Sequence, residues 1–427
     1  MTEIYPGCYR GEVASGLTVL AEPMPYLNSV SVGLWVKAGG RDDPPGKEGL
    51  AHFLEHMTFK GTERHSAAEI AQAIDVLGGH LNAATTNEYT FYYTEVLAGG
   101  LPAALSILEE LVTAPRLAED DLARERVVIE EEIRTIEDSP EDVAFQLLHE
   151  ALWTGGHPLG QPVVGRVASV AGLGRGDLWG FFRSRYTPSQ MALVAGGRVI
   201  PDELFSLASR FGSAHDPTGT PGRHPPQPGT GVALAERGIQ QVHFVVGFPT
   251  VPIGSPDRYG IEVLNSLLGG GVSSRLFQRV REELGLVYAV FSATSYHSDA
   301  GLLAIYAATE ERKLPQVVDL VGGEVDALAH RPPAPSDLSR AIQRLQNAFL
   351  LSLDDPSGRM VRLGTAAALG RTPAAPEDVL RRLGAVTADE IQELAQRYLV
   401  LDRAAWAAVG PSADRLRQFL GRHVGVA

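Results

Sequence analysis

The stretch EDDLARERVVIEEEIRTIEDSPED (residues 119–142) has a partner in the second half of the chain, PSDLSRAIQRLQNAFLLSLDDPSGR (residues 335–359). One constant offset, which places residue 119 on residue 335, aligns an Asp-Leu pair near each start and an Asp and a Pro near each end. Both stretches carry apolar residues at helical spacing, followed by a turn. Because the register is kept through a whole helix and its exit turn, the chain is predicted to contain two homologous halves.

A second, looser correspondence extends this repeat. Residues 30–54 and residues 242–265 each contain an alternating apolar strand, a turn rich in Gly, Pro and Asp, and a helix. The hydrophobic periods predict strands at 30–38, 89–97 and 241–248, and helices at 66–77, 102–113, 119–137, 337–353 and 387–399. Strands that return through hairpins favour antiparallel pairing. We therefore predict an α+β fold of two homologous α/β sandwich halves, each with helices packed on one face of a mainly antiparallel sheet.

A change in composition near the middle of the chain suggests where the halves are joined. With 427 residues the chain exceeds the usual size of a single domain. Residues 215–231, HDPTGTPGRHPPQPGTG, are dominated by Pro and Gly, which is typical of a linker. We predict a first domain at 1–214 and a second, homologous domain at 232–427.

Charge and composition exclude several classes of function. The formal net charge of -14 argues against nucleic acid and anionic membranes as partners, since both recruit cationic surfaces. Cys8 is the only cysteine, so neither an intrachain disulfide nor a thiolate zinc cluster can form. The N-terminal segment lacks the basic and apolar regions of a secretory signal, and no apolar run reaches membrane-spanning length. These features predict a cytoplasmic protein.

The stretch AHFLEHMTFKGT (residues 51–62) carries the first candidate for chemistry, because His52 and His56 are four positions apart. On a helix both imidazoles point to the same side, which suits two ligands of one zinc ion. The positions around the pair are largely apolar, so the imidazoles are predicted to lie inside the protein, where they need polar partners. The alternative is a surface helix with incidental histidines.

A catalytic zinc ion uses three protein ligands and a water, so one more ligand must come from elsewhere. The helix predicted at 119–137 has one stripe that combines apolar residues with two acids: Leu122, Glu125, Ile129, Glu132 and Ile136. At the repeat offset the two acids correspond to Ala341 and Ala348, so this helix does not need acids there to fold. We predict that Glu132 is the third ligand and that Glu125 orients a ligand imidazole. The alternative is a buried salt bridge unrelated to a metal.

Glu55 is predicted to have a different role. It directly precedes His56 but points about 100° away from it around the helix, so it can approach the attacking water rather than the metal. A carboxylate in that place can accept a proton from the water and later pass it to a leaving amine. The residues therefore predict metal-assisted hydrolysis, most naturally of a peptide bond.

The motif HFLEH, with a glutamate 76 positions after the second histidine, resembles the pitrilysin/insulinase family of zinc peptidases, in which the zinc motif is inverted. The stretches GGHLNAATTNEYTFYYTEVL (78–97) and GGGVSSRLFQRVREELGLVYAV (269–290) extend the resemblance along the chain. The size of the two halves is similar to the mitochondrial-processing-peptidase-like branch. The resemblance implies that His52, His56 and Glu132 bind one zinc ion and that Glu55 is the general base. Glu125 matches a further glutamate that recurs in the family.

The resemblance also implies how a substrate is held. Asn82 and Ala83 are similar to the edge strand on which an extended peptide is laid, although Asn82 also suits a turn before a strand. In the second half, Arg281 and Tyr288 resemble an Arg/Tyr pair that reaches the catalytic half and stabilises the charge developing on the scissile carbonyl. Arg279 lies close to the same family position and remains an alternative to Arg281.

At the level of the whole molecule, the resemblance implies a clamshell that encloses a chamber for peptides. Because the chain has both the zinc motif and an Arg/Tyr candidate, a homodimer is favoured, with a heteromeric partner as the alternative. One rival function is a non-catalytic assembly subunit of the same fold. Another is a metal-dependent ribosylhomocysteine lyase, but that chemistry needs cysteine both as ligand and as acid/base, and Cys8 alone cannot supply both.

Overall fold

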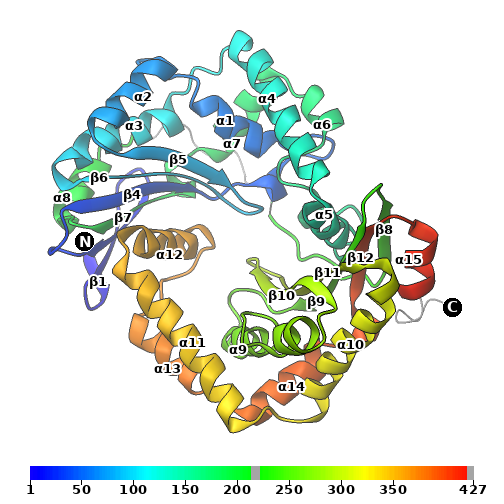
Figure 1. Cartoon of the computed structure of the whole chain (residues 1–427). Helices are drawn as coiled ribbons and strands as arrows, with labels where there is room; N and C mark the ends of the chain where they lie inside the picture. The colour runs from blue at the N-terminus through cyan, green and yellow to red at the C-terminus, as the bar shows by residue number, and fades with distance from the viewer. Residues whose placement is uncertain (213–221, 421–427) are drawn as a thin grey trace. The chain divides into compact units, whose positions relative to one another are not determined.

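The computed structural model describes residues 1–212 and 222–420, which form two compact units (Figure 1). Unit 1 comprises Met1–Ile133, Pro162–Arg223 and Leu350–Ala375, and unit 2 comprises the remaining segments. The change of unit after Arg223 falls within the predicted linker, of which residues 215–221 lie outside the described residues. The predicted limits of the two domains stay a prediction.

Unit 1 is built on a seven-stranded sheet with the order β1-β2-β3-β7-β4-β6-β5. All neighbours pair antiparallel except β3 and β7, which are parallel. The strands are β1 (Thr2–Tyr5), β2 (Cys8–Glu12), β3 (Thr18–Pro23), β4 (Ser29–Val36), β5 (His80–Thr85), β6 (Thr90–Leu97) and β7 (Met191–Gly197). Strand β5 therefore lies at one edge of this sheet.

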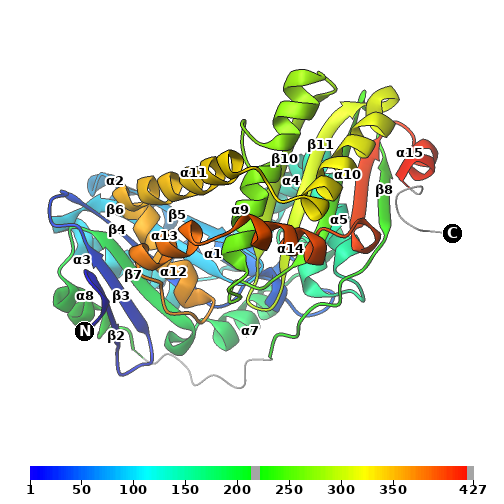
Figure 2. The same cartoon turned by 90° about the horizontal axis from the view of Figure 1, so that it is seen from below.

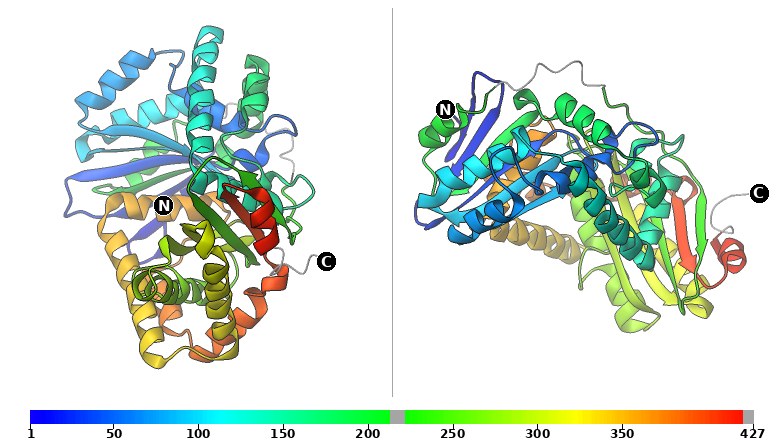
Figure 3. Two further views of the ribbon diagram at one scale, coloured as in Figure 1. Left: turned by 45° about the vertical axis from the view of Figure 1, so that its right-hand side comes forward. Right: turned by 90° about the horizontal axis from the view of Figure 1, so that it is seen from above.

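Helices cover both faces of this sheet. A large apolar core joins one face to the helices α1 (Leu50–Thr58), α2 (Ala67–Val76), α3 (Leu101–Thr113), α4 (Glu119–Asp138), α6 (Val167–Ala171), α7 (Arg175–Arg185) and α8 (Pro201–Ala208). The opposite face packs on α12 (Pro356–Ala368), which Figures 1 and 3 show in orange, across the sheet from α2 and α3.

Unit 2 repeats this plan with a five-stranded sheet of order β10-β11-β9-β12-β8. Its elements are α5 (Pro140–Leu152), β8 (Val232–Glu236), β9 (Gln241–Thr250), α9 (Arg258–Leu268), β10 (Val287–Tyr296), β11 (Gly301–Glu310), α10 (Leu314–His330), α11 (Pro335–Asp354), α13 (Pro376–Gly384), α14 (Ala388–Tyr398), β12 (Ala405–Gly410) and α15 (Ala413–Leu420). Helices α9, α10 and α14 cover one face and α5 covers the other (Figure 2).

The two sheets have the same topology. Chain order and pairing direction in β3-β7-β4-β6-β5 match those in β8-β12-β9-β11-β10, including one parallel pair in each, β3 with β7 and β8 with β12. Helices α4 and α11 both have 20 residues, and α5 and α12 both have 13. The prediction of two homologous α/β halves is thus confirmed, as are the predicted strands and helices.

The prediction that helices pack on only one face of each sheet is wrong, because a single helix covers the second face of each. Helix α5 follows α4 in the first half of the sequence but packs on β9 and β12 of unit 2. Helix α12 follows α11 in the second half but packs on β4 and β7 of unit 1. In unit 1 the buried Glu22 of β3 accepts hydrogen bonds from Arg359 Nη1 at 2.7 Å and Arg362 Nη2 at 2.8 Å, which fix α12 to the sheet.

No helix within residues 1–212 and 222–420 combines the length and apolar character needed to cross a lipid bilayer.

Candidate metal centre

Helix α1 presents the histidine motif, and its start is fixed by a carboxylate outside the helix. The Asp43 side chain accepts hydrogen bonds from the backbone amides of Gly49 and Ala51, both at 2.8 Å. Gly49 adopts a φ of 95°, a left-handed conformation that strongly favours glycine. The apolar residues around the motif are buried as predicted, so α1 lies within the core of unit 1 and its imidazoles have little freedom to move.

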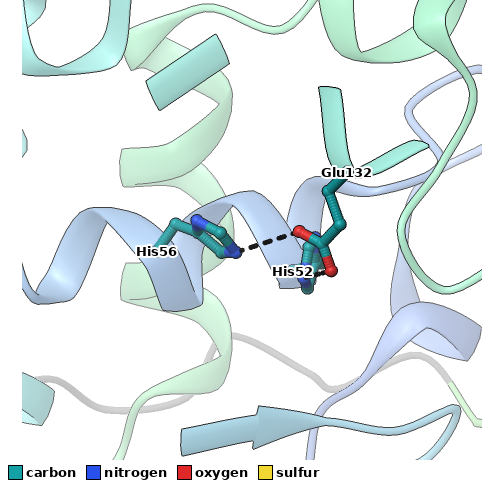
Figure 4. Close-up of side chains that lie close together, drawn as sticks. All are labelled: His52, His56 and Glu132. Atoms are coloured by element: carbon teal, nitrogen blue, oxygen red, sulfur yellow. Dashed lines mark ion pairs between the residues drawn. The ribbon is translucent and has the colours of Figure 1, made fainter. Parts of the chain in front are cut away.

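Three side chains of unit 1 converge at this helix: His52, His56 and Glu132 (Figure 4). One ligand atom from each lies within 4.8 Å of the others. His52 Nε2 is 3.7 Å from one oxygen of Glu132, and His56 Nε2 is 3.5 Å from the other oxygen. Ligand atoms around a tetrahedral zinc ion are roughly 3.3 Å apart, because the zinc bonds are about 2.0–2.2 Å long. Two imidazole nitrogens and a carboxylate at these separations fit zinc.

Glu125 occupies the position predicted for an orienting carboxylate. Its Oε2 lies 3.2 Å from His56 Nδ1, so that His56 meets Glu125 with one ring nitrogen and Glu132 with the other. The two glutamates are seven residues apart on α4 and therefore lie on one face of the helix. Glu125 is buried, with 8% of its side chain exposed, whereas 40% of the Glu132 side chain is exposed. The candidate site is thus closed behind Glu125 and open to solvent beside Glu132.

Charge is unevenly distributed among the candidate ligands. Burial, together with the smaller effect of the neighbouring His56, lowers the pKa of His52 to about 4 against the opposing effect of Glu132. Burial also acts to lower the pKa of His56, but the carboxylates of Glu132 and Glu125 outweigh this effect and raise it above the ordinary value. The hydrogen bond to His56 lowers the pKa of Glu132.

Glu55 is buried on α1 and is held by strand β5. Its Oε2 accepts a hydrogen bond of 2.5 Å from the hydroxyl of Thr85, the last residue of that strand. Burial raises the pKa of Glu55, and the Thr85 hydrogen bond opposes this shift. His56 and Glu132 are close enough to act electrostatically on the same carboxyl group. Glu55 therefore lies beside the three candidate ligands without being one of them.

We expect Thr85→Val to lower kcat about tenfold while zinc content is unchanged, because valine has nearly the same shape but cannot donate to Glu55. Thr85→Ser should restore the rate, since it restores the donor. Steady-state kinetics with metal analysis of each purified variant would test this. A Thr85→Val protein with wild-type kcat would show that the hydrogen bond has no role in turnover.

Asn82 and Ala83, predicted to contact substrate, lie on β5 at the edge of the first sheet. Asn82 is exposed, and its side chain is hydrogen-bonded to the Tyr93 hydroxyl at 3.4 Å and to the amide of Ala83 at 2.9 Å. The alternative of a turn residue is wrong, because Asn82 is inside the strand. The contact with substrate itself stays a prediction.

Arg281 and Tyr288 belong to unit 2. Arg281 lies in a π-helical turn, Phe277–Glu283, with its guanidinium 4.9 Å from the centre of the Phe277 ring. Tyr288 is on β10 and is 74% exposed. Arg279, the alternative to Arg281, forms an ion pair of 3.4 Å with Glu283. The predicted action of these residues on the catalytic half stays a prediction.

Two contacts of the candidate site were missed in the sequence, those of Thr85 and of Lys60. Lys60 Nζ lies 2.6 Å from Glu125 Oε1. Thr85 is in a stretch that the resemblance singled out and Lys60 is in the stretch that carries the histidine motif, but neither has a spacing that points to its partner. The predicted burial of Glu55 and Glu125 was the signal that could have indicated such partners, because a buried carboxylate requires a donor from some neighbouring element.

The fold and the site together define a class. Two imidazoles four residues apart, a carboxylate from a second helix and a separate buried glutamate are the groups of a zinc-dependent hydrolase, here built into one half of a duplicated α/β fold. Comparison with known proteins agrees with this class. The family model described as "Insulinase (Peptidase family M16)" matches residues 18–166, and the one described as "Peptidase M16 inactive domain" matches residues 172–345.

Relatives cover nearly the whole chain. A protein of Mycobacterium tuberculosis named as an uncharacterized zinc protease is 38% identical over 416 residues, which are 95% of this chain and 94% of that protein. The Bacillus subtilis protein YmxG, also named as a zinc protease, is 32% identical over 400 residues, 94% of this chain and 97% of that protein. The chain belongs to the insulinase family, peptidase family M16.

Solved structures agree with the fold. A peptidase M16 inactive domain from Pseudomonas fluorescens has a TM-score of 0.88 and 20% identity, with 95% of this chain and 98% of that chain covered. A protease from Helicobacter pylori has the same TM-score and identity, with 95% and 99% covered. At this identity the likeness concerns the fold alone.

Proposed function

We propose that this protein is a zinc-dependent endopeptidase that hydrolyses peptides or unfolded segments within an enclosed chamber. The observation that carries the proposal is the convergence of His52, His56 and Glu132 from two helices, with the buried Glu55 beside them. Relatives named as zinc proteases support the same activity.

The three candidate ligands would hold one zinc ion, which would supply Lewis-acid polarisation of the scissile carbonyl and make water a better nucleophile. Glu55 would accept the proton of the attacking water and then pass it to the amine that leaves. Burial raises the pKa of Glu55, which makes its carboxylate a stronger base for the first of these transfers. Thr85 would keep the carboxylate oriented during both transfers.

Strand β5 would bind the substrate. As an edge strand it offers backbone amide and carbonyl groups to an extended peptide. Such main-chain pairing depends little on the side chains of the peptide. Because Thr85 ends this strand, the peptide backbone would be laid beside the residue that holds Glu55. Arg281 and Tyr288 would stabilise the negative charge on the carbonyl oxygen from the second half.

Removal of the metal tests the proposal directly. We expect the purified protein to contain about one zinc ion per chain and to cleave an unstructured peptide. Dialysis against a zinc chelator should abolish cleavage, and added zinc should restore it. Cleavage that persists in metal-free protein would overturn the proposed function.

The alternative, a non-catalytic assembly subunit of the same fold, predicts zinc binding without cleavage of any unstructured peptide. For assembly we propose a homodimer, which light scattering of the purified chain would detect. A stable monomer with full activity would contradict the homodimer.

A further inference from the structure

We propose that Lys60 is a positioning residue of the zinc site, which holds the Glu125 carboxylate in the orientation that leaves His56 Nε2 available to the metal. The inference rests on the proposed function, because it concerns the same metal. It extends the site from the three ligands and Glu125 to a cation on the loop after α1.

The contacts form a chain from Lys60 to the candidate metal position. Lys60 Nζ lies 2.6 Å from Glu125 Oε1, the distance of a strong charge-assisted hydrogen bond. The other oxygen, Glu125 Oε2, lies 3.2 Å from His56 Nδ1. His56 Nε2 faces Glu132. Lys60 and His56 therefore contact different oxygens of the Glu125 carboxylate.

This series of contacts determines which nitrogen of the neutral His56 ring carries the proton. A neutral imidazole has one N–H and one lone pair, and the hydrogen bond made by one nitrogen fixes the state of the other. With Glu125 accepting at Nδ1, the lone pair is on Nε2, where a metal would bind. His52 has no such support, because its Nδ1 is buried without a hydrogen-bond partner among the described residues. His56 is therefore the candidate ligand whose tautomer the protein fixes through a carboxylate.

Lys60 itself is held in place, which distinguishes it from a flexible surface lysine. Its carbonyl oxygen accepts a hydrogen bond of 2.8 Å from Arg116 Nη2. The same guanidinium lies 3.2 Å from Asp121 in the first turn of α4. Arg116 thus ties the loop that carries Lys60 to the helix that carries Glu125. An exposed ion pair between two free side chains contributes little, but here one partner, Glu125, is buried and the other is anchored.

The test measures zinc affinity by competition with a chelator. Lys60→Met keeps the aliphatic stem and removes the charge, and we expect it to weaken zinc binding about tenfold, at the low end of the effect of residues that orient metal ligands. Lys60→Arg should stay within about threefold of wild type, because it keeps the charge and reach. Lys313→Met is the matched control, since Lys313 also pairs with a glutamate and is 29% exposed against 34% for Lys60.

A double-mutant cycle separates positioning from a general effect on stability. If Lys60 acts through Glu125, Lys60→Met should change zinc affinity less than twofold in a Glu125→Gln background. The absorption spectrum of the cobalt-substituted protein should change in Lys60→Met and not in Lys313→Met. Thermal unfolding of each metal-free variant would identify one that fails to fold, in which case Lys60→Gln replaces it.

Unchanged zinc affinity in folded Lys60→Met protein would overturn the inference and leave the proposed function intact. Additive losses in the cycle would also overturn it, because Lys60 would then act independently of Glu125. A wild-type protein that binds no zinc would overturn the proposed function, and this inference with it.

Discussion

Glu55→Gln is expected to lower kcat/KM for an unstructured peptide by about 10³-fold while the protein keeps its zinc. Glutamine has the shape of glutamate and can still accept the hydrogen bond from Thr85, so the packing of α1 is preserved. What it lacks is the ability to accept a proton from the attacking water. The loss corresponds to about 4 kcal/mol in the activation free energy, the usual contribution of a positioned general base.

The control for this variant is Glu131→Gln, on the exposed surface of α4. It removes the same charge from the same unit of the protein and should leave both zinc content and kcat/KM within about twofold of wild type. A Glu55→Gln protein that binds zinc and hydrolyses the peptide at the wild-type rate would refute the assignment of the general base. Loss of zinc from this variant would instead place Glu55 among the ligands.

The predicted elements agreed with the structure where local pattern determines them. Residues 241–248, predicted as a strand, lie in β9, and the helical period of residues 119–137 reappears in α4. The internal comparison with Ala341 and Ala348 identified two glutamates, and the structure places both beside His56. Such a comparison is informative because a duplicated helix shows which side chains the fold itself requires; the roles of the two glutamates stay a prediction.

The packing of α5 and α12 could not be predicted from a local pattern, because each packs on the sheet of the other half of the sequence. The apolar residues of α5 recur at helical spacing, which would suit packing on either sheet. Only long-range packing determines that this helix contacts β9 and β12. A smaller error has the same origin. The stripe predicted on α4 ended with Ile136, whereas the buried face of the helix includes Ile133 and leaves Ile136 half-buried. After Ile133 the helix leaves the core of unit 1, so the period that holds for its first turns no longer applies.

The contacts of Thr85 and Lys60 could not be predicted from the sequence for another reason. Each joins a residue with no distinctive spacing to an acid on a different element, so that the pairing exists only after β5 and the loop behind α1 have been placed. The general requirement that a buried carboxylate needs a donor holds for both. It predicts that a partner exists but does not say which residue supplies it.

Glu132→Ala is expected to weaken zinc binding by about 10²–10³-fold without unfolding the metal-free protein. A zinc site with four ligands binds with about 10–16 kcal/mol, so that one ligand accounts for roughly 2.5–4 kcal/mol. The helix should tolerate the change, because α11 has Ala348 in the corresponding position and is a helix of the same length. Alanine is also the residue most favourable to a helix interior.

Zinc affinity and the thermal unfolding of the metal-free protein should be measured on Glu132→Ala and on Glu131→Ala, its neighbour on the exposed surface of α4. We expect similar unfolding temperatures for both variants and a loss of zinc affinity only in the first. Equal zinc affinity in the two would mean that the third ligand is another group. A large loss of stability in metal-free Glu132→Ala would mean that the ion pairs with His52 and His56 maintain the fold, as the salt-bridge alternative requires.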